Sequence, residues 1–205
     1  MSGRFVVTGT DTGVGKTIFA AGLAAALGAS YWKPVQAGID DGGDSANARA
    51  LGAGDILPEA YRLKTACAPH VAAAIEGIAI DPAALKLPEV AGALVVEGAG
   101  GVLVPLAGEL LFADLFAIWG APVVLVARTA LGTINHSLLS IEALRRRGVE
   151  ILGVAFVGDP EPESESAILR LGRMRRIGRL PWLDPLNRET LAAAFAEHID
   201  LAAFR

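Results

Sequence analysis

The stretch "VVTGTDTGVGKT", Val6–Thr17, decides the fold of this 205-residue chain. An apolar strand runs into glycine-rich turns, and Gly15, Lys16 and Thr17 then open an alanine-rich helix. Glycines let backbone N–H groups curl around an anion, and the N-terminus of the helix adds its dipole. The Lys16 ammonium would reach the terminal phosphates of a nucleotide, and the Thr17 hydroxyl would bind Mg²⁺. The stretch therefore predicts a phosphate-binding loop between a strand and a helix.

This loop is a variant of the strict pattern, which has its first glycine five residues before Gly15. The chain has Thr10 there, and Gly9 lies one residue too early. The alternative interpretation is an ordinary strand-to-helix turn with a chance Gly-Lys-Thr. The strand before the loop and the helix after it favour phosphate binding.

Apolar runs and helical stretches alternate along the chain, which indicates βαβ units. Strands are expected at Phe5–Thr8, Tyr31–Val35, Ala93–Glu97, Val123–Ala127, Leu152–Val157 and Gly178–Leu180. Helices are expected at Lys16–Leu27, Asp44–Leu51, Phe112–Trp119, Thr133–Arg147 and Glu163–Arg176. Only Gly52–Pro88 shows no clear period. The pattern predicts a single α/β domain over residues 1–205, with a mostly parallel sheet covered by helices on both faces.

Composition excludes several classes of protein. Hydrophobic residues make up 53% of the chain and charged residues 20%, which is typical of a globular protein. The net charge of −4 argues against general nucleic-acid binding. The longest nearly unbroken apolar run, Ala117–Ala127, is too short to span a membrane. Cys67 is the only cysteine, so the chain has no internal disulfide and no cysteine metal motif, and we expect a cytoplasmic protein.

Two clusters of arginine residues occur in the chain despite its negative net charge. Arg145–Arg147 and Arg170–Arg179 fall near the ends of predicted helices, where cations complement the helix dipole. We therefore expect both clusters at solvated helix ends and not in a nucleic-acid site.

A second signal is "ALVVEGAGG", Ala93–Gly101, in which an apolar strand ends on Glu97 and glycines follow. In open α/β sheets ligands bind outside the carboxyl ends of the strands, where Glu97 would emerge. A carboxylate there suits Mg²⁺, and the alternative is a structural ion pair. Asp44, at the start of a predicted helix, is a further metal-ligand candidate, and its alternative role is an N-cap.

Lys33 lies in "YWKPVQAG", Tyr31–Gly38, among apolar neighbours and almost without a local charge partner. One interpretation is a surface lysine whose aliphatic stem packs on apolar side chains. The other is a lysine whose ammonium is directed at an anionic site.

Five motifs together resemble the dethiobiotin synthetase family: "GTDTGVGKT", "KPVQAG", "VEGAGG", "LGTINH" and "LPWL". The resemblance covers nearly the whole chain and implies a P-loop NTPase-like α/β protein that works as a homodimer. It implies an enzyme of biotin biosynthesis that uses ATP and Mg²⁺ to insert CO2, taken from bicarbonate, between the two amines of 7,8-diaminononanoate. The product is dethiobiotin, with ADP and phosphate, formed through a carbamate and a carbamic-phosphoric anhydride.

The resemblance also assigns residues to roles. The catalytic residues are Lys33 and Lys16, which flank the carbamate and the transferred phosphoryl group. The metal-binding residues are Thr17, Asp44 and Glu97. The nucleotide-binding residues are Gly13, Val14, Gly15, Lys16, Thr17, Ile18, Asp44, Glu97, Gly98, Ala99, Gly100, Pro181, Trp182 and Leu183. The substrate-binding residues are Thr12, Lys33, Ala37, Gly132 and Asn135.

The segment "LGTINHSLLS", Leu131–Ser140, resembles the part of the family that receives the substrate carboxylate from the partner subunit. The substrate site is therefore expected near the subunit interface. Free N–H groups at the start of a helix suit an anion, whereas simple helix capping is the alternative role of Asn135 and His136. His70 also matches a family feature, and we expect it to be structural.

Three positions depart from the family. Members often carry Glu at the position of Gly13, and Ser or Thr at the position of Ala37. An Asn that binds adenine usually stands at the position of Gly158. The resemblance therefore predicts relaxed nucleotide selectivity, and it predicts that Gly158→Asn restores some preference for ATP.

Two other classes share parts of this pattern. Partitioning and cell-division ATPases carry a signature lysine at the position of Asp11, and they need a basic membrane tail or DNA-binding patch, whereas this tail is nearly neutral. Glutamine-dependent amide ligases need a hydrolysing nucleophile, for which Cys67 has no suitable setting. Neither nucleic acid nor a membrane is an expected partner.

Overall fold

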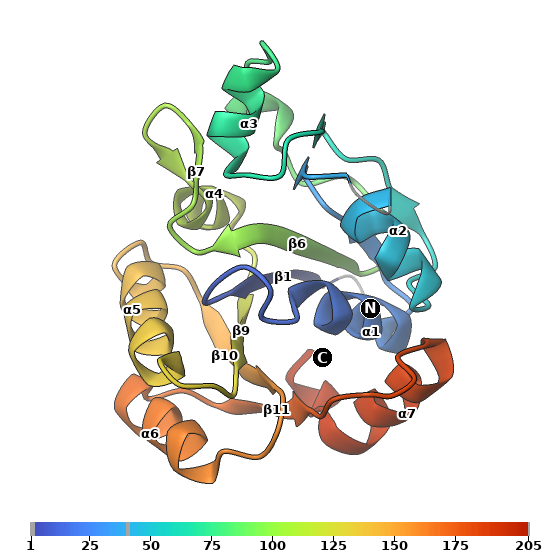
Figure 1. Ribbon diagram of the computed structural model, residues 1–205, viewed down its shortest axis with the longest axis vertical. Helices are drawn as coiled ribbons and strands as arrows, with labels where there is room; N and C mark the ends of the chain where they lie inside the picture. The colour runs from blue at the N-terminus through green and yellow to red at the C-terminus, as the bar shows by residue number, and fades with distance from the viewer. Residues whose placement is uncertain (1–2, 40–41, 205) are drawn as a thin grey trace.

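A computed structural model describes residues 3–39 and 42–204 of the chain. Its centre is a sheet of seven parallel strands in the order β11-β10-β9-β1-β6-β2-β4 (Figure 1). These strands are β1 Arg4–Gly9, β2 Ser30–Trp32, β4 Ile56–Leu57, β6 Leu94–Gly101, β9 Val123–Arg128, β10 Ile151–Val157 and β11 Arg176–Leu180. Because β1 lies between β9 and β6, the loop after β1 opens at the middle of the carboxyl edge of the sheet.

Helices cover both faces of the sheet (Figure 1). The helices are α1 Lys16–Leu27, α2 Gly43–Ala50, α3 Pro69–Ile75, α4 Phe112–Trp119, α5 Thr133–Arg145, α6 Pro162–Gly172 and α7 Arg188–His198, with 3₁₀ turns η2 Pro82–Ala84 and η3 Leu201–Phe204. Alternate residues of β1 point to opposite faces, so Val7 belongs to the core cluster that includes residues of α1, α2 and α7, and Val6 to the cluster that includes residues of α4, α5 and α6. The predicted α/β class with a mostly parallel sheet is confirmed.

The expected strand Tyr31–Val35 is wrong as a single element. The structure divides it into β2, which ends at Trp32 in the central sheet, and β3 Val35–Ala37, which pairs with β5 Tyr61–Leu63 in a separate sheet. Pro34 explains the break, because proline has no N–H to continue the ladder. Lys33 therefore lies at the point where the chain leaves the central sheet.

The expected helix Glu163–Arg176 is too long. Helix α6 ends at Gly172, and Arg173 has a left-handed backbone with a φ of 48° that turns the chain into β11. Arg176 and Arg179 consequently belong to β11 and pair with Glu165 of α6, so the expectation of a solvated helix end is wrong for these two arginines. The other cluster does lie at a helix end, since α5 ends at Arg145.

Several elements were not expected from the sequence. These are α3, α7, η2, η3 and the short strands β4, β5, β7 Pro105–Ala107 and β8 Leu110–Leu111. Helix α7 packs on α1, where the rings of Phe195 and Phe19 lie 5.3 Å apart. Most of these elements are too short to show a hydrophobic period. Within the described residues, no helix has the length and apolar character needed to cross a membrane.

Candidate active site

The loop between β1 and α1 is built to hold an anion. Gly15 is the N-cap residue of α1 with a φ of 95°, and no side chain caps the helix there. A Cβ at Gly15 would also come within 3.0 Å of the Val157 side chain, so only glycine fits without a shift. The first N–H groups of α1 have no partners within the helix, and together with the helix dipole they form a site for phosphate.

Lys16 begins α1 and is only 6% exposed. Its Nζ donates a hydrogen bond to the carbonyl oxygen of Asp11, 2.7 Å away across the loop. Burial and repulsion from Lys33 lower the pKa of Lys16 to about 8, although Glu97, Asp44 and Asp11 act in the opposite direction. Without a bound anion, the nearby carboxylates therefore compensate the positive charge of Lys16 only in part.

Strand register brings Lys33 and Glu97 together. Trp32 of β2 is paired with Val96 of β6, so the residues that follow them lie side by side: Lys33 just after the end of β2, and Glu97 within β6. Lys33 Nζ lies 2.8 Å from Glu97 Oε1 and donates a second hydrogen bond to the Gly98 carbonyl oxygen at 2.9 Å. Both side chains are almost fully buried.

Asp44, from the first turn of α2, completes this cluster. Its Oδ2 lies 2.7 Å from Lys33 Nζ. The Thr17 hydroxyl lies 3.0 Å from Asp44 Oδ1 and 2.9 Å from Glu97 Oε1. Burial alone would lower the pKa of Lys33, but the charges of Glu97 and Asp44 outweigh it and raise this pKa. Burial alone would raise the pKa of Asp44, but the charge of Lys33 outweighs it and lowers this pKa.

These contacts decide between the alternatives left by the sequence. Lys33 is 2% exposed, so the interpretation as a surface lysine is wrong. Asp44 is not an N-cap, because α2 begins at Gly43 and its N-cap residue is Gly42. Glu97 does form an ion pair, and its partner is Lys33.

The donor set fits a hard divalent cation. Thr17, Asp44 and Glu97 direct oxygen atoms at one small region beside the phosphate-binding loop. Among residues 3–39 and 42–204, no group of three or more His, Cys, Asp or Glu side chains could hold a metal ion by itself. Mg²⁺ characteristically binds one or two carboxylates and takes its remaining ligands from phosphate and water. The set therefore fits an ion that arrives with a nucleotide.

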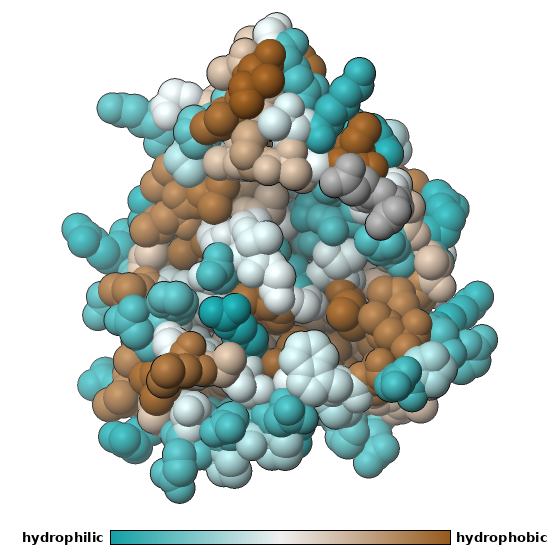
Figure 2. All heavy atoms as spheres, in the orientation of Figure 1, coloured by the Kyte–Doolittle hydropathy of each residue, from teal (hydrophilic) through white to brown (hydrophobic). Residues whose placement is uncertain are grey.

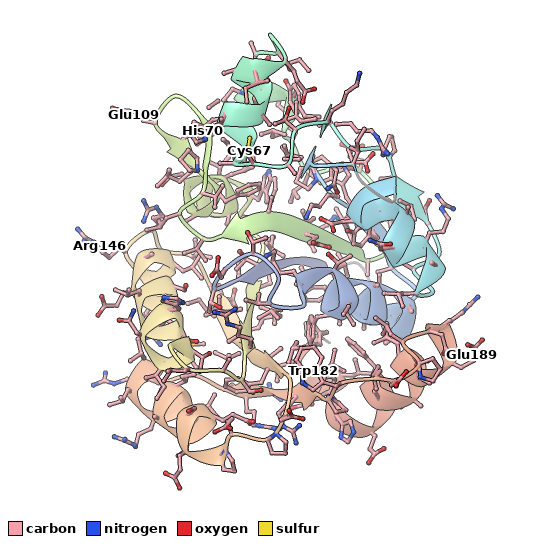
Figure 3. The ribbon with its side chains drawn as sticks, in the orientation of Figure 1. Cys67, His70, Glu109, Arg146, Trp182 and Glu189 are labelled. Carbon is pink, nitrogen blue, oxygen red and sulfur yellow. The ribbon has the colours of Figure 1, made fainter. Side chains whose placement is uncertain are left out.

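A cavity of about 1110 Å³ opens over the loop and this cluster. It is large enough for a nucleotide together with a second substrate. Hydrophilic side chains lie in the hollow at the middle of the face in Figure 2. In Figure 3, Cys67 near α3 and Trp182 after β11 lie on opposite sides of β1 and α1, and both line the cavity.

Most of the predicted site residues meet at this cavity. They are Thr12, Gly13, Val14, Gly15, Lys16, Thr17, Ile18, Lys33, Ala37, Asp44, Glu97, Ala99, Gly100 and Trp182. Five predicted residues do not line it: Gly98, Pro181, Leu183, Gly132 and Asn135. Of these, Gly98 still contributes its carbonyl oxygen to Lys33, and Pro181 and Leu183 flank Trp182.

Gly132 and Asn135 lie at the exposed start of α5. Gly132 is the N-cap residue with a φ of 91°, and no side chain caps this helix. Helix capping by Asn135 or His136 is therefore wrong as an alternative role, and both side chains are exposed. His70 is also exposed, at the start of α3, and does not line the cavity (Figure 3).

Sequence reasoning missed several residues of the site. Gln36 is buried, accepts a hydrogen bond from the Asp44 N–H at 3.0 Å and donates one to the Gly38 carbonyl at 2.7 Å, so it fixes the start of α2. Its place inside "KPVQAG" was a usable signal. Further lining residues lie just before or at the start of α3, and at or just after the ends of β9 and β10: Cys67, Pro69, Arg128, Thr129, Ala130 and Asp159. These residues are far from the phosphate-binding loop in the sequence, and only the fold brings them to the site.

The backbone conformation of Gly158 bears on the prediction that Gly158→Asn restores ATP preference. Its φ is 126°, a region that favours glycine, and a Cβ there would overlap Thr129 Oγ1. The Gly158 N–H also donates to the Leu180 carbonyl at 2.9 Å, which holds this backbone in place. The expectation that Gly158→Asn restores ATP preference is therefore corrected, because the new side chain would first strain the backbone.

Comparisons with known proteins agree with this architecture. Residues 3–190 match a family model described as an AAA domain. The septum site-determining protein MinD of Pyrococcus horikoshii, solved with Mg-ADP, has a TM-score of 0.57 and 18% identity, and the match covers 95% of this chain and 86% of that one. At this identity the likeness shows the fold alone.

Two curated relatives are much more similar in sequence. The ATP-dependent dethiobiotin synthetase BioD of Rhodopseudomonas palustris strain BisB18 is 60% identical over 198 residues, which cover 95% of each chain. The protein of the same name from Rhizorhabdus wittichii is 63% identical over 199 residues, 96% of this chain and 95% of that one. The septum site-determining protein is thus similar in fold alone, whereas the near-full-length sequence matches are named dethiobiotin synthetases. This chain belongs to the family of ATP-dependent dethiobiotin synthetases.

Proposed function

We propose that this chain closes a cyclic urea on 7,8-diaminononanoate with CO2 and ATP, releasing dethiobiotin, ADP and phosphate. Family membership supports this reaction, since relatives at 60% and 63% identity carry the name dethiobiotin synthetase. The observation that carries the proposal is the buried ammonium of Lys33, held by Glu97 and Asp44 beside the phosphate-binding loop. A lysine in that place serves a reaction that gathers negative charge.

The proposed reaction has three steps. One amine of the substrate adds to CO2 and loses a proton, which gives a carbamate. A carbamate oxygen then attacks the γ-phosphorus of ATP, the bond to the bridging oxygen breaks, and ADP leaves. Finally the second amine attacks the carbonyl carbon, loses its proton and displaces phosphate as the ring closes. The carbamate and the transferred phosphoryl group bring negative charges close together on this path.

The two lysines provide the matching positive charge. Lys16 follows the loop after β1, and Lys33 follows β2, so they approach the cavity from different strands. They are near enough for the charge of Lys33 to lower the pKa of Lys16. Charge held in place before the reaction stabilises a phosphoryl-transfer transition state most effectively. We assign both lysines to the carbamate and the γ-phosphate.

Thr17, Asp44 and Glu97 are the residues that would hold Mg²⁺. Their oxygen atoms converge beside the loop, as such a site requires. A bound Mg²⁺ would supply positive charge that neutralises the phosphates of the nucleotide. Lys33 forms ion pairs with Asp44 and Glu97, the two carboxylates of this set. We infer that it shares them with the ion or gives them up when the nucleotide binds.

The nucleotide is proposed to lie along the loop from Gly13 to Ile18, with its base toward Trp182. Trp182 is 68% exposed and lines the cavity, so its ring face is open to a planar ligand. Such stacking tolerates any base. The substrate amines are placed at the other end, between Thr12, Lys33 and Ala37.

We further propose a cytoplasmic homodimer in which the start of α5 receives the substrate carboxylate of the neighbouring subunit. Gly132 and Asn135 are exposed here and do not reach the cavity of their own chain. The same segment carries two exposed apolar side chains: Leu131 is 101% exposed and Leu139 is 57% exposed. An apolar surface next to a substrate-binding segment favours a subunit contact.

A single assay tests the reaction. Purified protein is incubated with Mg-ATP, bicarbonate and 7,8-diaminononanoate, and the product is identified by mass while ADP and phosphate are measured. We expect dethiobiotin, ADP and phosphate in equal amounts. Hydrolysis of ATP without urea formation would instead support the ATPase class that shares this fold.

A further inference from the structure

Tyr31 is a buried polar residue that the proposed reaction does not use. It lies in β2, is 0% exposed and does not line the cavity. Its hydroxyl nevertheless donates a hydrogen bond of 2.7 Å to Glu97 Oε2. Buried tyrosine hydroxyls need a partner, but most find a backbone carbonyl or water, and this one is directed at a carboxylate of the site.

Sheet geometry explains how the hydroxyl reaches Glu97. Tyr31 is paired with Val95, and Glu97 lies two residues further along β6. Side chains two residues apart on a strand point to the same face, so Glu97 and Val95 share the face that α1 covers. The long Tyr31 side chain runs along this face toward the carboxyl edge. Its hydroxyl therefore reaches Glu97 from the side opposite to the cavity.

The two oxygen atoms of Glu97 have separate partners. Oε1 accepts from the Thr17 hydroxyl at 2.9 Å and from Lys33 Nζ at 2.8 Å. Oε2 is bonded to Tyr31. The terminal torsion of a glutamate is soft, so the carboxylate plane is set by its hydrogen bonds. Tyr31 supplies the bond on the buried side that keeps Oε1 directed toward Thr17.

The Tyr31 hydroxyl is the donor of this hydrogen bond, because an ionised carboxylate oxygen can only accept. Replacement by phenylalanine would leave Oε2 of a carboxylate that is 1% exposed without this donor.

We propose that Tyr31 is a positioning residue for Glu97, which orients this carboxylate for the metal ion that accompanies the nucleotide. The inference rests on the proposed function of Glu97 as a metal ligand and goes beyond it. Partners that orient a metal ligand typically contribute about tenfold to a hundredfold in metal affinity or activity. Tyr31 acts through Glu97 and does not touch the reacting atoms.

The test compares Tyr31→Phe with Tyr61→Phe, which changes the other tyrosine of the chain. The Tyr61 hydroxyl accepts a hydrogen bond from the Asp81 N–H at 2.8 Å and is outside the cavity. Calorimetry measures the Kd for ADP in excess Mg²⁺ and in EDTA. The Kd in EDTA divided by the Kd in Mg²⁺ is the contribution of the metal. We expect Tyr31→Phe to reduce this ratio by about tenfold or more, and Tyr61→Phe to leave it unchanged.

Two further measurements separate the possible failures. Thermal unfolding without ligands reports any purely structural role of Tyr31, and a lower Tm with an unchanged Mg²⁺ contribution would overturn the inference. Glu97→Gln tests the underlying site. If this variant keeps the full Mg²⁺ contribution, the proposed metal site is wrong and the role of Tyr31 falls with it; if it loses the contribution while Tyr31→Phe keeps it, only the inference about Tyr31 is wrong.

Discussion

Lys33 Nζ lies 2.7 Å from Asp44 Oδ2, and this ion pair joins the edge of the central sheet to the first turn of α2. With Glu97 on its other side, the ammonium occupies a position between two carboxylates that also suits a divalent cation. The protein therefore keeps its carboxylates neutralised before the nucleotide arrives. A cation brought by the nucleotide would compete for them and leave Lys33 free to turn toward the cavity.

Replacing Lys33 should remove turnover and leave nucleotide binding largely intact. Loss of one fixed charged donor typically lowers the rate by about a hundredfold to a thousandfold. We expect Lys33→Ala and Lys33→Gln to lose at least this much in kcat, with a Kd for Mg-ADP that is no weaker than that of the unmodified protein. Steady-state kinetics and calorimetry measure the two quantities. Near-normal turnover would show that Lys33 is only a structural partner of Asp44 and Glu97.

The same variant should reveal the competition with the metal. Removal of one partner of a buried ion pair typically lowers stability by about 3–5 kcal/mol, because a charge is left uncompensated. We expect Lys33→Gln to lose stability of this order in EDTA and to regain more from Mg²⁺ than the unmodified protein does. Denaturant unfolding with and without Mg²⁺ measures the effect.

Arg175→Met is the control for this experiment. Arg175 pairs with Asp200 at the surface, where such pairs contribute about 0–1 kcal/mol, and Mg²⁺ should not alter its effect. If Mg²⁺ stabilised the unmodified protein, Lys33→Gln and Arg175→Met equally, this result would contradict competition between Lys33 and the metal ion.

Lys16 makes nucleotide binding depend on pH. Its pKa of about 8 lies below the unfolded value of 10.5, so the folded protein without ligand binds fewer protons than the unfolded chain between these values. Stability from this group is therefore lowest below pH 8, where Lys16 is charged, and rises toward pH 10.5. A bound phosphate reverses this preference because it favours the charged form.

ADP binding in EDTA should therefore take up a proton at pH values above about 8. We expect the affinity to fall by up to about tenfold for each further pH unit. Calorimetry at pH 8.5 in two buffers of different ionisation enthalpy measures the uptake directly. Affinity that stays constant from neutral pH to about two units above it would contradict the prediction.

The phosphate-binding loop and the position of Glu97 could be predicted because both are local. A glycine-rich stretch between a strand and a helix, or a carboxylate after an apolar run, needs only a short-range pattern. The expected end of the strand at Glu97 is nevertheless wrong, because β6 continues to Gly101. The partners of Lys33 could not be derived this way, since Glu97 is 64 positions away in the sequence. Their contact depends on the register of β2 and β6, which the resemblance to a family supplied only indirectly.

Other features were outside the reach of sequence patterns. Pro34 should have ended the expected strand, but the run of apolar residues around it obscured the break. The role of Tyr31 was hidden because an aromatic residue in a strand looks like core, and only the hydroxyl distance to Glu97 distinguishes it. The backbone of Gly158 was also hidden, since a φ of 126° cannot be derived from its neighbours.

Close packing of α1 on α7 gives a test of stability. Gly22 of α1 lies against Phe195, and a Cβ at this position would overlap the aromatic ring. Alanine favours a helix by about 1 kcal/mol over glycine, but overpacking a core typically lowers stability by about 1–3 kcal/mol. We expect Gly22→Ala to lower the free energy of unfolding, as measured with denaturant. Gly54→Ala, which has no neighbouring atom within 4 Å of the new Cβ, should change it little; equal effects would contradict the packing argument.

Nucleotide selectivity should be relaxed because no side-chain amide is present at Gly158. A buried hydrogen bond to the adenine edge would discriminate by about 1–3 kcal/mol, so we expect GTP or CTP to support turnover within about a hundredfold of ATP. Gly158→Asn cannot serve as the reverse test, since its Cβ would overlap Thr129 Oγ1. Trp182→Ala is the better comparison, because loss of stacking typically weakens binding by about 1–3 kcal/mol whatever the base. Specificity constants for the four nucleoside triphosphates measure both effects. A strict preference for ATP in the unmodified protein would mean that backbone groups around Trp182 and Gly158 read adenine without a side chain.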